Sequence, residues 1–581
     1  MIKRSINKFV KNTWKFLLKN WSSILIISLV IAFSIWLMAS TFGYKDGEIL
    51  IKAKLNSDFL SHIPLIRSFS MGENFPPEYP HFPGSPIKYH FLFYALVGLL
   101  EKFGLRIDIA LNLLSIIGFA GLLICIFLLA KKLTKSNFVG IGAILTIIFN
   151  SSLSWIYYFF IGKNHLQNLV DLFSTKLFGS FGPYDDNIIS AFWNLNIYTN
   201  QRHLAFSFLL MFLAIWLVVY CKGKKKLLIA LLIIGIMSWM HKAVLMIAFI
   251  ILGVFFFAFP QKKKRILITI FVGMIFALPG LLFLNTVGEG NRLFNWQPGF
   301  LFKSTTWWEM RPGSDLEQWI IYWFFNMGIL PILAISGSLL MVFSQKVEST
   351  KNIFTKLYLR LINPETAWFI VATIMFVIAN LFNFGTDMTN NHKLITFTIM
   401  IWGVYAYLFL KTVFDNIKVF GKIVVPILII FLLIGGICDI FPINNDEVGV
   451  IDDIEKSKNA QWVVKNSQAK DVFLNLTSDF YFVMLSGRKI YLGVPYFNWS
   501  LGYPENERVA QINTLLTDNF PRDKFCPFLR QKNIQFFYIK QGDNKIIDED
   551  FSTTQFLEKY NDGIELNYGI KMYKTDNTCG K

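Results

Sequence analysis

An aspartate and a histidine four residues apart are the first candidates for chemistry in this sequence. Asp58 and His62 lie in SDFLSHIPLIRSF, residues 57–69, and a spacing of four puts both side chains on one face of a helix. A carboxylate beside an imidazole can orient a base, hold a hydroxyl or contribute metal ligands. The pair also fits a plainer interpretation, an aspartate stabilised by the dipole of a helix N-terminus and a solvated histidine. The two residues alone do not decide between these interpretations.

Three short motifs at the ends of apolar runs supply cations and hydrogen-bond donors: TNQRH (199–203), MHK (240–242) and NNHK (390–393). Polar residues at membrane depth are costly and tend to mark function. The forked donors of arginine suit phosphate, whereas a lysine at the end of a membrane helix can simply extend to the lipid headgroups. The candidates for binding an anion are Arg202, His203, His241, Lys242, His392 and Lys393.

Apolar helices must position these groups. The chain has 581 residues, of which 54% are hydrophobic and only 16% charged, so we predict a polytopic α-helical membrane protein. The run 227–259 is too long for one helix and carries Trp239 to Lys242 at its centre, which predicts two short spans with a tight apex. Runs long enough to cross a bilayer lie at about 22–43, 107–130, 137–162, 204–221, 264–285, 318–343, 367–383, 394–411 and 423–441.

The net charge of +18 follows the same organisation. Up to residue 440 there are 39 basic and 19 acidic residues, against 17 and 19 from Phe441 onward. The basic residues form short clusters between apolar runs, as at 222–226 and 262–265. Such clusters mark the cytoplasmic side of a membrane protein. Nucleic acid is not expected as a partner, because the sequence shows no basic groove with interleaved aromatic residues.

The positive-inside rule then predicts a topology. Residues 1–20 are expected to form a basic interfacial helix, with the N-terminus on the inner side of the cytoplasmic (plasma) membrane. If the segment from Tyr89 to Phe103 does not cross, the chain has about 11 spans and its C-terminus lies outside. All seven histidines then fall on the outside face or just beneath it. The first outside loop, 45–104, is far longer than the 2 to 8 residues usual between packed helices. It also contains Asp46 and Glu48.

The tail, 445–581, changes character. Helical patterning at 451–468 and 505–518 alternates with the β-rich runs DVFLNL, FYFVML, KIYLGV and IQFFYIK. This alternation predicts a small extracytoplasmic α/β domain. Cys526 and Cys579 could pair there in an oxidising compartment, although their spacing along the chain leaves the question open.

With these features the chain resembles the C-type (GT-C) superfamily of polyprenyl-phosphate-sugar-dependent integral membrane glycosyltransferases. SDFLSHIPLIRSF supplies an early acidic residue after the first span, and GSPIKYHFLFYAL (84–96) supplies a Pro/Gly/Tyr approach to a membrane-parallel helix. The resemblance covers about 45–440, within a transmembrane domain 21–441. It implies that Asp58 is the catalytic carboxylate, with His62 beside it, although Asp46 and Glu48 stay open as alternatives.

The resemblance implies transfer of a sugar from a polyprenyl-phosphate donor to an acceptor at the outside face. The acceptor would be a glycan, lipid or protein of the cell envelope, and membrane lipid would surround the protein. The six cations and donors named above would bind the donor phosphate. Some members use a divalent metal, and Asp58 with His62 offers two ligands, too few to define a site. The rival hypotheses are a lipid or polysaccharide transporter or flippase, and a non-catalytic envelope assembly protein. The sugar, the acceptor, the stereochemical outcome and the oligomeric state stay undetermined at this point.

Overall fold

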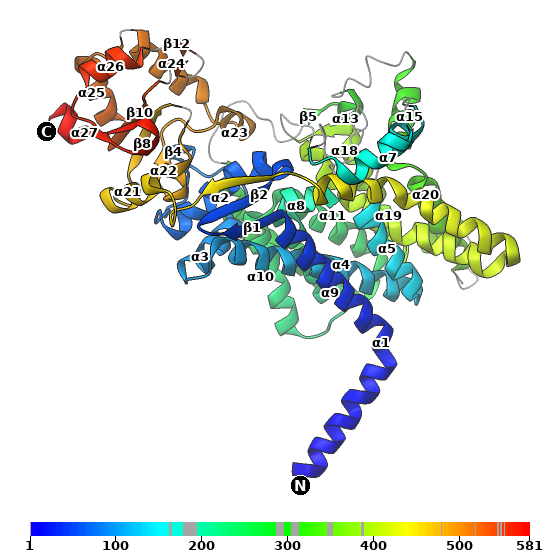
Figure 1. The fold of residues 1–581 in the computed structure, drawn as a ribbon. Coiled ribbons are helices and arrows are strands. Elements are labelled where there is room, and N and C mark those ends of the chain that lie inside the picture. The colour runs from blue at the N-terminus through cyan, green and yellow to red at the C-terminus, as the bar shows by residue number, and fades with distance from the viewer. Residues whose placement is uncertain are drawn as a thin grey trace.

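Apolar helices form most of the chain, and a smaller mixed α/β region lies against one side of them (Figure 1). Six helices are long and apolar enough to cross a membrane among the residues that the structure describes, or eight if each of two bent pairs is one span. The six lie within α1 (Ile2–Thr41), α4 (Ile107–Thr134), α9 (Arg202–Val219), α12 (Lys263–Asn285), α19 (Thr389–Asn416) and α20 (Lys418–Asn444). This computed structural model describes residues 2–150, 152–161, 165–177, 195–285, 295–303, 313–345, 353–384, 389–477, 479–517, 519–542, 545–546, 549–550 and 552–580.

Two predicted spans are bent rather than continuous. The predicted span 318–343 is two helices, α15 (Asp315–Met327) and α16 (Leu330–Ser344), at 89° to each other. Gly328 ends α15 at φ 59° and Pro331 lies in the first turn of α16, and both residue types favour a helix boundary. The span predicted at 137–162 bends by 62° after α5 (Asn137–Phe149). The predicted total of about 11 spans therefore stays a prediction.

The first part of the chain is continuous with the first span. Within residues 1–20, predicted to form a basic interfacial helix, α1 begins at Ile2 and runs without a break to Thr41. Its N-terminal half extends away from the other helices (Figure 1). The interfacial position of this segment stays a prediction.

The apex predicted in the run 227–259 is confirmed. The helices α10 (Lys224–Met240) and α11 (Lys242–Ala258) meet at His241, whose backbone is extended (φ −169°, ψ 107°). Only one residue separates the two helices, so the side chain of His241 is held at their junction.

The segment after the first span folds back over the end of the bundle. It contains α2 (Asn56–Ser70) and α3 (Leu92–Lys102). The 11 residues of α3 extend roughly 16 Å at about 1.5 Å per residue, only about half of a hydrocarbon core of roughly 30 Å. A helix of this length agrees with the non-crossing interpretation. Gly98 allows α3 to lie directly on α2, because a β-carbon there would be 2.6 Å from the carbonyl oxygen of Ile66.

The tail contains a five-stranded sheet in the order β13-β14-β10-β8-β9. Strand β8 is parallel to both β9 and β10, whereas β14 is antiparallel to β10 and to β13. The strands are β8 (Val472–Leu476), β9 (Lys489–Ile490), β10 (Phe536–Lys540), β13 (Ile564–Glu565) and β14 (Ile570–Lys574). Helices on this sheet include α21 (Lys458–Asn466), α24 (Glu505–Thr517), α25 (Arg522–Gln531), α26 (Thr553–Lys559) and α27 (Thr575–Cys579).

Two of the four predicted β-rich runs contain strands: DVFLNL contains β8 (Val472–Leu476), and IQFFYIK contains β10 (Phe536–Lys540). The run KIYLGV is a strand only at Lys489–Ile490. The prediction of a strand at FYFVML is wrong, because Tyr481–Leu485 forms the helix α22. Four successive residues of this run are buried, and a short apolar run buried on all sides does not distinguish a strand from a helix.

The tail is joined to the first loop by a shared sheet. Strand β7 (Val448–Asp452) pairs antiparallel with β2 (Glu48–Lys52), which pairs with β1 (Phe42–Lys45). An unpaired edge of β2 would expose backbone donors and acceptors, and β7 covers it. The loop and the tail therefore form one structural unit over the end of the helical bundle (Figure 1).

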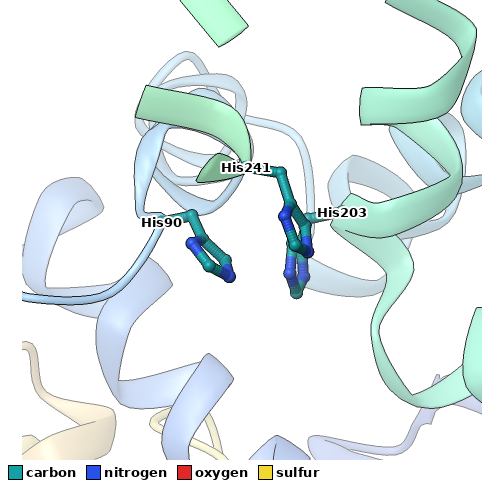
Figure 2. Close-up of side chains that lie close together, drawn as sticks. All are labelled: His90, His203 and His241. Carbon is teal, nitrogen blue, oxygen red and sulfur yellow. The ribbon is translucent and has the colours of Figure 1, made fainter. Parts of the chain in front are cut away.

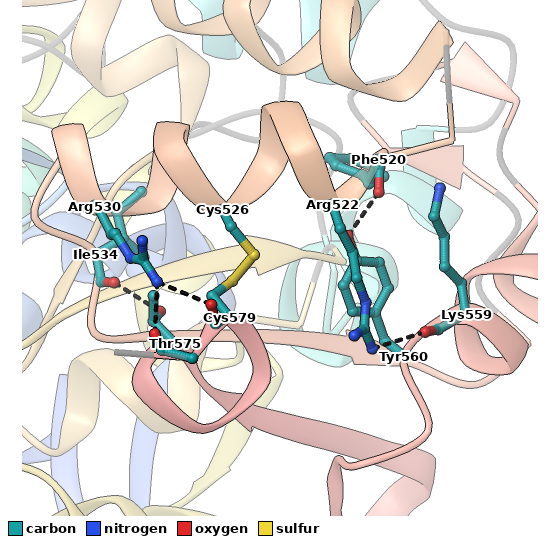
Figure 3. Close-up of a disulfide and its surroundings, with 10 residues drawn as sticks. Phe520, Arg522, Cys526, Arg530, Ile534, Lys559, Tyr560, Thr575 and Cys579 are labelled. Atoms are coloured by element: carbon teal, nitrogen blue, oxygen red, sulfur yellow. Dashed lines mark hydrogen bonds between the residues drawn. A yellow bond between two sulfur atoms is a disulfide. The ribbon is translucent and has the colours of Figure 1, made fainter.

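A disulfide fastens the last helix to the tail. Cys526 of α25 is bonded to Cys579 of α27 (Figure 3). Beside it, Arg530 Nη2 donates a 2.9 Å hydrogen bond to the carbonyl oxygen of Cys579, and Thr575 Oγ1 donates to the carbonyl oxygen of Ile534. The pairing that the sequence left open is thus present.

Candidate functional site

Four of the seven histidines meet beneath α2 and α3. His90 lies in the segment between β4 (Phe82–Pro86) and α3, His203 in the first turn of α9, and His241 at the junction of α10 and α11. The ring centroids of His90 and His241 are 4.2 Å apart, and those of His203 and His241 are 5.4 Å apart. Figure 2 shows the three rings side by side, although they come from segments far apart in the sequence. His62 of α2 lies 6.1 Å from His203 by ring centroids.

Two tyrosines connect His62 with His203. Tyr94 Oη lies 2.8 Å from His203 Nδ1, and Tyr89 Oη lies 3.4 Å from His203 Nε2 and 3.5 Å from His62 Nε2. The His62 ring also stacks on Tyr94 at 4.5 Å. Burial, with a smaller contribution from the charge of Arg202, lowers the pKa of His62 to about 3. His62 is therefore a neutral ring at physiological pH and serves as a hydrogen-bonding and stacking group.

Asp58 lies at the edge of this cluster. It is in the first turn of α2 and is partly exposed. Burial raises the pKa of Tyr89 and Tyr94 well above its usual value, and the negative charge of Asp58 adds to the rise at both phenols. The carboxylate is thus close enough to both tyrosines to act on them electrostatically.

The other two carboxylates considered from the sequence are placed differently. The side chain of Asp46 is 83% exposed at the turn between β1 and β2. Glu48 forms an ion pair with Lys456 of the tail, which also contacts Asp452. Among these three carboxylates, Asp58 is the one that acts on the tyrosines of the histidine cluster.

Arg202 is buried and held by protein acceptors. Its Nη1 donates to Asn112 Oδ1 at 2.5 Å, and its Nη2 donates to Thr41 Oγ1 at 2.9 Å and to the carbonyl oxygen of Met38 at 3.2 Å. The guanidinium also lies over the rings of Phe42 and Phe59. These contacts tie α9 to α1 and α4, so in this arrangement Arg202 positions the helix that carries His203.

Two lysines add positive charge next to the histidines. Burial, followed by the charges of His241, Lys393 and Lys242, lowers the pKa of His90 well below its usual value. Lys393 is only 6% exposed and donates a 3.1 Å hydrogen bond to Asn390 Oδ1. Lys242 donates to the carbonyl oxygen of Leu284 at 3.2 Å. Both lysines therefore act electrostatically on the cluster, and their role as ligands of a donor phosphate stays a prediction.

His392 does not belong to the group of close ring nitrogens. It is fully buried in α19, one residue before Lys393. Among the residues that the structure describes, the ring nitrogens within 4.8 Å of one another are those of His90, His203 and His241.

Sequence reasoning did not assign roles to His90, Tyr89 and Tyr94. All three lie in KYHFLFY, residues 88–94, the segment that leads into the non-crossing helix. This segment is rich in aromatic residues that also carry hydrogen-bonding groups. That pattern could have indicated a ligand site, because such residues are common where an apolar wall must also hold a polar ligand.

An apolar groove of about 540 Å³ lies between α15, α16, α18 (Ala367–Leu381) and α19. Trp319, Phe369, Phe376 and Trp402 are among its lining residues. At one end, Asn380 Oδ1 accepts hydrogen bonds from the indoles of Trp319 and Trp323, each at 2.8 Å.

That end of the groove adjoins the start of α19. Asn391 donates a 2.8 Å hydrogen bond to the carbonyl oxygen of Ala379, the residue before Asn380, and Lys393 follows two residues after Asn391. The groove thus ends next to the segment that brings Lys393 to the histidines.

The arrangement combines a carboxylate, hydrogen-bonding phenols and imidazoles, one buried and one half-buried ammonium group, and a nearby apolar groove. These groups can accept a proton, orient hydroxyls and offset the charge of an anion that carries an apolar chain. No protein-family model matches the chain, and no curated protein matches it.

Proposed function

We propose that this protein is an integral membrane glycosyltransferase that moves a sugar from a polyprenyl-phosphate donor to an acceptor hydroxyl at the outside face of the plasma membrane. The observation that carries the proposal is the meeting of Asp58 with His203, His241 and Lys393. They come from α2, α9, the α10–α11 junction and α19, and they gather at the end of an apolar bundle. Groups this far apart in the sequence meet in one place more readily when they share a ligand.

The chemistry assigned to these groups is a displacement at the anomeric carbon. The acceptor oxygen forms a bond to that carbon while the bond from the carbon to the phosphate oxygen breaks. The electron pair of the broken bond leaves with the polyprenyl phosphate, and the proton of the acceptor hydroxyl passes to the carboxylate of Asp58. Lys242 and Lys393 offset the charge that grows on the departing phosphate.

The groove at α15, α16, α18 and α19 supports a lipid-linked donor. Its lining is almost wholly apolar, as an isoprenoid chain requires. Because its Asn380 end adjoins the segment carrying Lys393, a chain in the groove would bring its phosphate toward the two lysines.

The cysteines support the outside location of the tail. Cys526 and Cys579 are paired in the tail, whereas Cys125, Cys221 and Cys438 are free and lie in or next to apolar helices. Disulfides persist in oxidising compartments. In this orientation the histidine cluster lies on the same side as the tail, because the shared sheet joins the tail to the first loop.

The test is donor consumption by the purified protein in lipid nanodiscs. We expect the wild type to cleave a radiolabelled polyprenyl-phosphate sugar in the presence of a crude envelope acceptor fraction. Asp58→Asn should reduce the rate by roughly 10²–10⁴-fold, the usual contribution of a general base. The matched control is Asp46→Asn, which changes a carboxylate of the same loop at an exposed turn and should retain the wild-type rate.

Two outcomes would contradict the proposal. Full turnover by Asp58→Asn, at equal protein level, would remove this carboxylate from the mechanism. Wild-type protein that cleaves none of a panel of polyprenyl-phosphate sugars, but moves a lipid-linked glycan across a vesicle bilayer, would favour the flippase hypothesis.

A further inference from the structure

We propose that His90, His203 and His241 form a binding site for a divalent transition-metal ion of the zinc class. One nitrogen from each ring lies within 4.8 Å of the other two. The inference concerns the three imidazoles and does not require that the protein transfer a sugar.

The separation of the nitrogens is close to what a tetrahedral ion needs. Bonds of about 2.0–2.1 Å to each nitrogen place the nitrogens roughly 3.3–3.4 Å apart. The nitrogens lie within 4.8 Å of one another. To reach the tetrahedral geometry, rotation of the side chains has to shorten the distance between two nitrogens by at most roughly 1.4 Å. The three rings already project from separate segments into one space (Figure 2).

Two of the three rings have ring nitrogens without another partner. Both ring nitrogens of His90 and of His241 are buried without a hydrogen-bond partner among the described residues, and His241 is only 1% exposed. A buried polar group left without a partner destabilises the folded state. Four such nitrogens on two adjacent rings indicate a site built for a ligand. A metal ion would satisfy one nitrogen on each ring.

The third histidine already has the neighbour expected of a metal ligand. Tyr94 Oη lies 2.8 Å from His203 Nδ1. When Nδ1–H donates to this phenol oxygen, Nε2 is left unprotonated, and it can coordinate the ion once its 3.4 Å contact with Tyr89 Oη is released. Metal-bound histidines usually donate their second N–H to a fixed acceptor, which sets the tautomer and the ring orientation.

The surrounding charges define the kind of site. A histidine binds a metal as the neutral ring. Lys242 and Lys393 oppose a bare cation, so we expect the ion to bind together with an anion, either hydroxide or a phosphate oxygen, at its fourth position. Three imidazoles favour zinc, cobalt or nickel over magnesium or calcium, which prefer oxygen ligands.

The experiment measures metal content directly. The full-length protein, purified through a tag without histidine, is stripped with chelator in nanodiscs and loaded with Co²⁺. Bound cobalt is measured by mass spectrometry, and its ligand-field absorption reports tetrahedral nitrogen coordination. We expect one cobalt per chain in the wild type, and His90→Gln and His241→Gln should each lose most of it.

Two further variants separate coordination from folding. His392→Gln removes a buried histidine of the same bundle that lies outside the group, and it should keep the wild-type cobalt content. Tyr94→Phe removes no ligand but should weaken cobalt affinity by about 10–100-fold, the usual effect of losing a group that orients a ligand.

The inference fails if the wild type retains well under one cobalt per chain, or if His392→Gln loses as much cobalt as His90→Gln. These results are distinguishable from failure of the proposed function. Asp58→Asn protein should bind cobalt normally while failing to consume donor, and metal-free wild type that transfers sugar at full rate would overturn any role of the ion in transfer.

Discussion

The contact between the first loop and the tail depends on Arg67, a residue of α2. Its Nη2 lies 2.7 Å from Asp453 Oδ2 in the tail, and its Nε lies 3.3 Å from Glu101 Oε1 in α3. The three side chains are only 3%, 6% and 8% exposed. Replacing Arg67 by methionine keeps the length of the side chain but leaves two buried carboxylates without their cation.

Removing one partner of a buried ion pair costs about 3–5 kcal/mol. At about 1.4 kcal/mol per factor of ten, this corresponds to a rise of roughly 10²–10⁴-fold in the opening of the contact. Hydrogen exchange of the β7 amides measures that opening, because β7 pairs with β2 immediately before Asp453. We expect Arg67→Met to speed exchange in β7 by this factor, while amides in β10 keep their wild-type rates.

A triple variant provides the control. Arg67→Met combined with Glu101→Gln and Asp453→Leu removes all three charges, so no buried charge is left unpaired. Replacing a whole buried charged group by apolar or neutral residues is often close to neutral for stability. The triple variant should therefore recover most of the lost protection. If Arg67→Met alone leaves β7 exchange within about twofold of the wild type, the ion pairs do not hold the tail on the loop.

Two further predictions concern the tail and the loop that contacts it. Denatured, unreduced protein should bind three equivalents of a maleimide, and reduced protein five, because Cys526 and Cys579 are paired and three cysteines are free; equal labelling before and after reduction would contradict the pairing. Burial lowers the pKa of His81 to about 3. Its contribution to stability is fully present above the ordinary pKa of about 6.5 and is lost as the pH falls toward 3, since only the unfolded state takes up the proton in that range. His81→Gln should therefore reduce the loss of melting temperature between pH 7.5 and pH 5, and an unchanged loss would show that this ring does not control it.

Much of the fold could be predicted because it depends on local patterns. Hydropathy located the helices α4, α9, α12, α19 and α20 to within a few residues. The apex at His241 was predictable too, since a run of 33 mostly apolar residues between lysine clusters is too long for one span. The bend between α15 and α16 was not predicted, because hydropathy does not depend on the direction of the helix axis.

The candidate site was predicted only in part. The end-of-span positions of His203, His241 and Lys393 singled them out, and Asp58 was indicated by its place after the first span. The interpretation of Arg202 as a phosphate ligand depended on its residue type and on its place at the end of a span. In the structure its donors are engaged by Asn112, Thr41 and Met38, which are distant in sequence and carry no pattern that points to it.

Local sequence patterns are enough to predict that this chain is built from apolar helices, that its polar residues concentrate in a few motifs, and that the tail differs in composition from the rest. These properties follow from the free energy of burying each segment, which depends on that segment alone. The folded structure is needed to see that His90, Tyr89 and Tyr94 join His203 and His241, and that β7 fastens the tail to β2. Those contacts link residues up to about 400 positions apart, and they depend on how helices and strands pack in space, which no local pattern specifies.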